Sequence, residues 1–127
     1  FGGNNVACAA GMAVLDVLEK EQLQASAQKV GEHLKAGLRG LMKKHDLIGE
    51  VRGMGLMIGV ELVTDRKALT PATKETKRVL NLMRDHGVLV GYEGRHVNIV
   101  KVRPPMPFKI EHADQTVDAM DKALRAL

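Results

Sequence analysis

The sequence predicts an α+β fold, in which helices cover a small, mostly antiparallel sheet of three to four strands. Long segments near both ends repeat an apolar residue every three or four positions, as amphipathic helices do. Short segments in the middle alternate apolar and polar residues, or are rich in valine, as strands are. The predicted order is α-α-β-β-α-β-β-α, and 127 residues are enough for one such domain.

The N-terminal part is predicted to form two consecutive helices, at about residues 5–19 and 22–44. Small residues dominate the start of the first, which suits a close approach to another backbone. The second has an apolar stripe formed by Leu23, Ala27, Val30, Leu34, Leu38 and Leu41. A coiled-coil hairpin would also fit, but the stripe is short and interrupted by glycines, so packing onto a domain is favoured.

Two strands are expected next, at residues 48–52 and 56–63, where apolar residues alternate with others. Gly53 and Gly55 mark a bend or bulge between them. The glycine spacing also invites comparison with a dinucleotide-binding loop. These glycines lie between strands and do not open a helix, so that function is disfavoured.

The second half is predicted to contain a helix, two short strands and a last helix. Thr70 is expected to cap the helix, with Pro71 at its first position and Gly87 at its end. The strands are expected at residues 88–91 and 98–102, and prolines end the second. Residues 111–127 have helical spacing of apolar residues and complete the fold.

Composition disfavours several classes of function. The net charge is +4, but basic residues are interleaved with acidic ones, and two Phe, one Tyr and no Trp leave no platform for stacking bases, so no nucleic-acid partner is expected. No apolar run approaches the ~18 residues of a membrane span. The five histidines show no metal-ligand spacing, so no metal is expected. Cys8 stands alone and is predicted to be a small buried hydrophobe, which favours a reducing compartment, the cytoplasm.

The stretch GYEGRHVNIVKVRPPMPF concentrates cations near the second short strand. Arg95, Lys101 and Arg103 supply them, and Gly91 and Gly94 flank a turn. From the residues alone, a polar loop followed by an edge strand is favoured. An anion-binding rim at the end of a strand is the functional alternative.

Four stretches occur together in order, and the chain resembles a known family through them: FGGNN, VRGMGLMIGVEL, GVLVG and KVRPPM. The set is similar to the C-terminal region of the class III aminotransferases, fold-type I enzymes that use pyridoxal 5'-phosphate (PLP). These are of the alanine–glyoxylate, ornithine and 4-aminobutyrate aminotransferase type. The resemblance covers essentially the whole chain. It implies a C-terminal small domain over residues 22–127, with residues 1–21 as a lead-in helix from the large domain.

The resemblance also implies how the parent enzyme works. It would be a homodimer that transfers an amino group from an amino acid or amine to a 2-oxo acid, with PLP as electron sink. The Schiff-base lysine lies upstream in the family, so neither bound PLP nor activity is expected for this chain alone, and its large domain and second subunit would be missing partners. Phe1, Gly2, Gly3 and Asn4 would lie near the cofactor and the subunit interface.

Lys101 occupies the position, three residues before the first proline, where many members carry an arginine that binds the substrate carboxylate. Lys101 and Arg103 are therefore expected to bind substrate from the same face of a strand. Lysine lacks the fork that binds a carboxylate at two points, so a standard α-amino acid is less favoured. A similar pattern occurs in relatives resembling PLP-dependent phospho-lyases, which remain an alternative acting on a phosphorylated amine. A non-catalytic binding module is the alternative from a different class.

Overall fold

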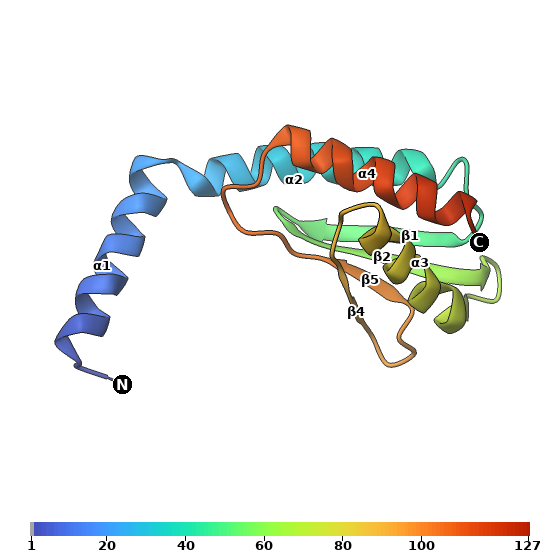
Figure 1. Cartoon of the computed structure of the whole chain (residues 1–127), viewed down its shortest axis with the longest axis horizontal. Coiled ribbons are helices and arrows are strands. Elements are labelled where there is room, and N and C mark those ends of the chain that lie inside the picture. The colour runs from blue at the N-terminus through green and yellow to red at the C-terminus, as the bar shows by residue number, and fades with distance from the viewer. Residues whose placement is uncertain (1) are drawn as a thin grey trace.

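The α+β architecture is confirmed in a computed structural model, which describes residues 2–127 (Figure 1). The elements follow the predicted order, with one additional two-residue strand. They are α1 (Asn5–Lys20), α2 (Leu23–Leu41), β1 (Ile48–Met54), β2 (Met57–Asp65), β3 (Thr70–Pro71), α3 (Thr73–Asp85), β4 (Gly91–Glu93), β5 (Ile99–Val102) and α4 (Ile110–Arg125).

The sheet has the strand order β1-β2-β5-β4, and β3 pairs with β2 beside this path. All pairings are antiparallel, as predicted. Inward residues of β2 and β5, such as Val60 and Val100, are fully buried beneath α2, α3 and α4. The alternating residues, such as Gly59 and Lys101, remain partly exposed, so the helices cover one face and leave the other open.

Glycines allow α2 to pack closely on its neighbours. A Cβ added at Gly31 would stand 2.0 Å from the carbonyl oxygen of Gly55, in the β1–β2 turn. A Cβ at Gly37 would stand 2.7 Å from Cγ2 of Val117 in α4. The glycines therefore do not break the apolar stripe; Leu34 and Leu38 beside them are fully buried. Gly53, at φ 138°, and Gly55, at φ 53°, form the expected bend between β1 and β2.

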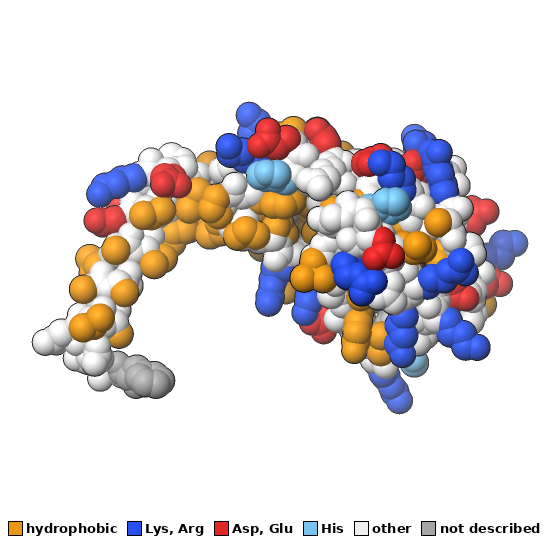
Figure 2. Space-filling model, in the orientation of Figure 1, with side chains coloured by type: hydrophobic (Ala, Val, Ile, Leu, Met, Phe, Trp, Pro, Cys, Tyr) orange, Lys and Arg blue, Asp and Glu red, His pale blue; other side chains and the backbone are white. Residues whose placement is uncertain are grey.

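Helix α1 extends away from the rest of the domain (Figure 1). None of its residues is buried, and apolar side chains line it and continue onto the start of α2 (Figure 2). Gln22 joins the two helices in the left-handed conformation, at φ 51°. The prediction that Cys8 is buried was wrong: Cys8 is exposed, because nothing in the described residues packs on α1 there.

The prediction that Thr70 and Pro71 open a helix was wrong. Both residues continue the sheet as β3, opposite Asp65 and Val63, and α3 begins only at Thr73. The amide of Ala72 donates to the carbonyl oxygen of Leu62 at 3.1 Å and extends this pairing. The sheet therefore holds the segment that local signals assigned to a helix.

The predicted strand at residues 88–91 was also misplaced, because β4 spans Gly91–Glu93. The partner strand β5 ends at Val102, and the prolines that follow have no amide to continue a ladder. Residues 88–90 therefore lie outside the sheet, and Leu89 is 85% exposed instead of buried.

In the part of the chain that the structure describes, no helix has the length and apolar character needed to cross a membrane.

Candidate substrate-binding site on the open sheet face

Lys101 reaches the open face of the sheet through the alternation of β5. Its neighbours Val100 and Val102 point into the core, so Lys101 points the opposite way. Across the sheet it lies opposite Gly59 of β2 and Gly91 of β4. A Cβ at Gly91 would lie 3.5 Å from Cε of Lys101, so the lysine side chain extends over the glycine of β4. Gly91 thus leaves the space that the lysine side chain uses.

Glu93 binds Lys101 from the neighbouring strand. The Lys101 Nζ donates a hydrogen bond to Oε1 of Glu93, two residues beyond Gly91 on the same face of β4. This hydrogen bond, together with the lysine charge, lowers the pKa of the Glu93 carboxyl, and the charge of Arg103 adds a smaller contribution. Glu93 is therefore a carboxylate that both predicted site cations stabilise.

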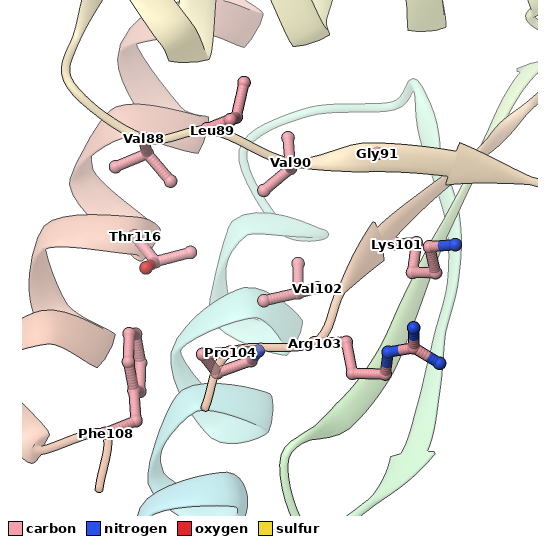
Figure 3. A pocket seen from close by; sticks show the side chains of 10 residues that line it. All are labelled: Val88, Leu89, Val90, Gly91, Lys101, Val102, Arg103, Pro104, Phe108 and Thr116. Atoms are coloured by element: carbon pink, nitrogen blue, oxygen red, sulfur yellow. The ribbon is translucent and has the colours of Figure 1, made fainter. Parts of the chain in front are cut away.

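Arg103 follows directly after β5 and is exposed. Figure 3 shows the Lys101 and Arg103 side chains extending to the same side, away from Val88 and Thr116. A hollow of about 210 Å³ lies between the segment before β4, the end of β5 and α4. Among residues 2–127, Arg103 forms no ion pair with a carboxylate. The two predicted residues therefore come together, with Arg103 the less engaged cation.

A larger hollow, of about 490 Å³, lies on the open face beside Lys101. Met54, Met57 and Ile99 give it an apolar surface, and Arg52 borders it on the β1 side. Arg52 donates to Oε2 of Glu61 at 2.6 Å and also to Glu50. The hydrogen bond to Glu61 is the largest cause of a raised pKa for the guanidinium. The hollow therefore combines an apolar floor with paired charges at its rim.

Sequence reasoning missed Glu93 and Arg52 as part of this site. Glu93 appeared only as a residue between glycines, and Arg52 as the end of a strand. The period-two pattern could have placed Glu93 on the face of Gly91. Its contact with Lys101 depends on the register in which Gly91 opposes Lys101, and the chain sequence alone does not reveal that register.

Gly2, Gly3 and Asn4 lie far from Lys101, at the outer end of α1 (Figure 1). Phe1 lies outside the described residues. The Asn4 side chain caps α1, because its Oδ1 accepts a hydrogen bond from the amide of Ala7 at 3.0 Å. Within this chain, the structure does not bring Gly2, Gly3 and Asn4 together with Lys101 and Arg103.

Neither Lys101 nor the buried Lys35 is free to attach PLP in residues 2–127. The cofactor needs a lysine for covalent attachment and a carboxylate for its ring nitrogen. Lys101 already binds Glu93 in an open hollow, and the buried Lys35 donates to Glu32 and to the carbonyl oxygen of Gly53. In the same residues, no group of three or more His, Cys, Asp or Glu side chains could hold a metal ion.

Comparison with known proteins identifies the family. The family model described as "Aminotransferase class-III" matches residues 1–124. The chain belongs to the class III aminotransferases. Enzymes of this family are PLP-dependent, and the resemblance inferred from the four sequence stretches is confirmed.

Individual members of the class III aminotransferase family include both transaminases and phospho-lyases. The chain is 51% identical to "Alanine--glyoxylate aminotransferase 2 homolog 2, mitochondrial" from Arabidopsis thaliana, over 98% of this chain and 26% of that protein. A phospholyase from Arthrobacter in complex with phosphoethanolamine superposes with a TM-score of 0.93 at 36% identity, over 98% of this chain and 30% of that one. An amine transaminase from an uncultivated Pseudomonas species, in its PLP-bound form, superposes with a TM-score of 0.86 at 37% identity. The match covers 94% of this chain and 27% of that one.

The class III chain described here therefore spans between a quarter and a third of the length of these relatives. It corresponds to their C-terminal part, and their remaining domain has no counterpart in it. A complete cofactor site is therefore not expected in residues 2–127 alone.

Proposed function

We propose that this chain is the substrate-positioning domain of a PLP-dependent aminotransferase, which transfers an amino group from an amino acid or amine to a 2-oxo acid. Lys101 and Arg103 bind the anionic group of the substrate in the full-length enzyme. The observation that carries the proposal is their common direction at the end of β5 (Figure 3). Lys101 also borders the larger hollow on the open sheet face.

The electrostatics of the site suit an anion. Lys101 and Arg103 are fixed positive charges at one strand end, and a carboxylate of the chain itself already binds Lys101. A charge-assisted hydrogen bond is about twice as strong as a neutral one. The apolar surface of Met54, Met57 and Ile99 would contact the carbon skeleton of the substrate. Chemistry at the amino group belongs to PLP, which the rest of the enzyme holds.

Residues 1–21 form, in this proposal, a lead-in from the large domain, and residues 22–127 the small domain. The bare apolar side chains of α1 support this division, since such surfaces are normally covered by another domain or subunit. Phe1, Gly2, Gly3 and Asn4 would then approach the cofactor and the second subunit of a homodimer. A cytoplasmic location remains a prediction; the Arabidopsis relative is named as mitochondrial, so cell fractionation is the test.

A phospho-lyase acting on a phosphorylated amine is the second candidate. Lysine at position 101 favours it, because a compact ammonium binds phosphate as a point charge and does not need a planar partner. The likeness to the Arthrobacter phospholyase supports the same candidate. The two functions differ in product: one releases inorganic phosphate, and the other converts a 2-oxo acid into an amino acid.

The test is a panel of amino acids, amines and phosphorylated amines offered to the full-length enzyme. Lys101→Ala should lower kcat/KM for anionic substrates by about tenfold or more. Lys101→Arg should favour carboxylates over phosphorylated amines. Lys77→Ala, on the exposed face of α3, is the matched control and should behave like the wild type. Equal kinetics for all variants would overturn the role of Lys101, and a full-length protein that binds no PLP would favour a binding module.

A further inference from the structure

Glu93 contacts Lys101 of the proposed site directly, and Arg103 lies further along the chain on the other side of Lys101. The Glu93 carboxylate accepts a hydrogen bond from Lys101, and the charge of Arg103 also stabilises its ionised form. The contact crosses Gly91, where any larger residue would meet the lysine side chain. The side chains of Lys101 and Glu93 are 32% and 57% exposed, so an incoming anion reaches both of them.

We propose that Glu93 is a specificity-determining residue, whose carboxylate occupies Lys101 until a substrate anion displaces it. This inference rests on the proposed function, because it requires Lys101 to bind the substrate anion. An anion that displaces Glu93 accepts the hydrogen bond from Lys101 in its place. The Glu93 carboxylate then has no cation bound to it and repels the anion beside it. Glu93 therefore weakens the binding of every anion, and it weakens the more highly charged ones most.

The charge balance gives this inference a quantitative signature. Lys101 and Arg103 with Glu93 carry a net charge of one positive unit, which a carboxylate balances and a phosphate dianion exceeds. Coulomb energy is proportional to the product of the two charges, so removing Glu93 favours a dianion by twice the free energy that it gives a monoanion. A threefold gain for a monoanion corresponds to about a tenfold gain for a dianion, because the factor is squared.

A surface ion pair with no function is the alternative, and such pairs contribute little to stability. Glu93→Asp separates the two cases, because aspartate keeps the charge but is one methylene shorter and reaches Lys101 less well. If Glu93 acts by occupying Lys101, the aspartate variant binds anions more tightly than the wild type. Asp118→Asn is the matched control, because it removes one charge from a similarly exposed carboxylate, which binds Lys122 in α4 instead of Lys101.

The experiment measures the inhibition constants of acetate and inorganic phosphate, as competitors of substrate, in the full-length enzyme at about pH 8, where phosphate is mainly the dianion. Glu93→Gln should lower the constant for acetate about threefold and that for phosphate about tenfold. Asp118→Asn should leave both constants within about twofold of the wild type. The KM of an amine donor without an anionic group should not move in any variant.

Three outcomes decide between the ideas. If Lys101→Ala leaves both inhibition constants unchanged, the proposed function of Lys101 fails and the role of Glu93 fails with it. If Lys101→Ala raises them but Glu93→Gln leaves them unchanged, the inference about Glu93 alone is overturned. Equal gains for acetate and phosphate in Glu93→Gln would also overturn it, because the removal of a charge must act more strongly on the dianion.

Discussion

Gly31 in α2 lies directly against the backbone of Gly55 in the β1–β2 turn. A Cβ on Gly31 would come within 2.0 Å of the Gly55 carbonyl oxygen, a distance that only a backbone shift could relieve. We expect Gly31→Ala to destabilise the chain by about 2 kcal/mol, because overpacking against rigid backbone outweighs the helix propensity of alanine. The free energy of unfolding in urea measures the effect.

Gly40 provides the control for Gly31, since it lies in the same helix with no atom within 4 Å of an added Cβ. Gly40→Ala should stabilise by up to about 1 kcal/mol through helix propensity alone. A Gly31→Ala variant that is as stable as Gly40→Ala would mean that α2 and the turn are not in contact.

His45 and Asp121 join the end of α2 to α4 through a bond of 2.6 Å between Nε2 and Oδ1. This bond is the largest cause that lowers the pKa of Asp121 below the ordinary value of 3.8 for an aspartate, and Arg125 adds to it. A lowered carboxyl pKa gives stability above pH 3.8 that is lost as the pH falls through the folded value. Asp121→Asn should therefore reduce stability at neutral pH, by about 1 kcal/mol, and flatten its decline in acid.

The pair formed by His33 and Asp114 is the control for this prediction. It also joins α2 to α4 at 2.6 Å, but its side chains are 45% and 63% exposed, against 12% and 16% for His45 and Asp121. Asp114→Asn should cost less than half as much as Asp121→Asn, because solvent screens an exposed pair. If both variants lose the same free energy of unfolding at neutral pH, burial does not determine how much these pairs contribute to stability.

Arg66 holds the connection between α2 and β1 by donating to three carbonyl oxygens. Its Nη2 lies 2.6 Å from the oxygen of Met42 and 2.9 Å from that of His45, and its Nε lies 3.1 Å from that of Ile48. Lysine cannot reproduce this fork, so Arg66→Lys should lower the melting temperature and cost about 1 kcal/mol or more. Arg84→Lys, at an exposed arginine that donates to its exposed neighbour Asp85, should change the melting temperature little.

The exposed apolar side chains of α1 should make the 127-residue chain self-associate. Val6, Met12, Val14 and Leu15 are each more than half exposed, and clustered apolar surface of this kind favours association. Sedimentation velocity over a range of concentrations should reveal oligomers, and deletion of residues 1–20 should remove them. Association that survives the deletion but disappears in Met57→Glu would place the contact on the open sheet face instead.

The parts of the fold that the sequence predicted are those in which local pattern and tertiary packing agree. Leu56, Ile58, Val60 and Leu62 recur at every second position and are all buried, so β2 was found to within two residues at each end. Thr70 and Pro71 have strong helix-start signals, but pairing with β2 overrides them. Local propensity cannot anticipate such pairing, because the partner lies in another segment.

The candidate site was predictable to a similar degree. Alternation and the family resemblance pointed to Lys101 and Arg103, which are two residues apart at the end of β5. Glu93 was not predicted as their partner, because its contact arises between strands with an intervening loop. The prediction that Cys8 is buried failed because it relied on local sequence alone. The small neighbours of Cys8 suit a crowded helix, but none of the described residues packs on α1 at this position.

Gln22 gives the junction of α1 and α2 a mechanical property. Its φ of 51° and ψ of 39° change the direction of the chain between the two helices. Its side chain stabilises the turn by donating a hydrogen bond to the carbonyl oxygen of Glu19 at 2.8 Å. Helix α1, with 16 residues, is a lever about 24 Å long. A torsional change of about 10° at this residue would move the far end of the lever by about 4 Å. Gln22 therefore controls how far a body attached at Asn4 travels relative to the anchored sheet.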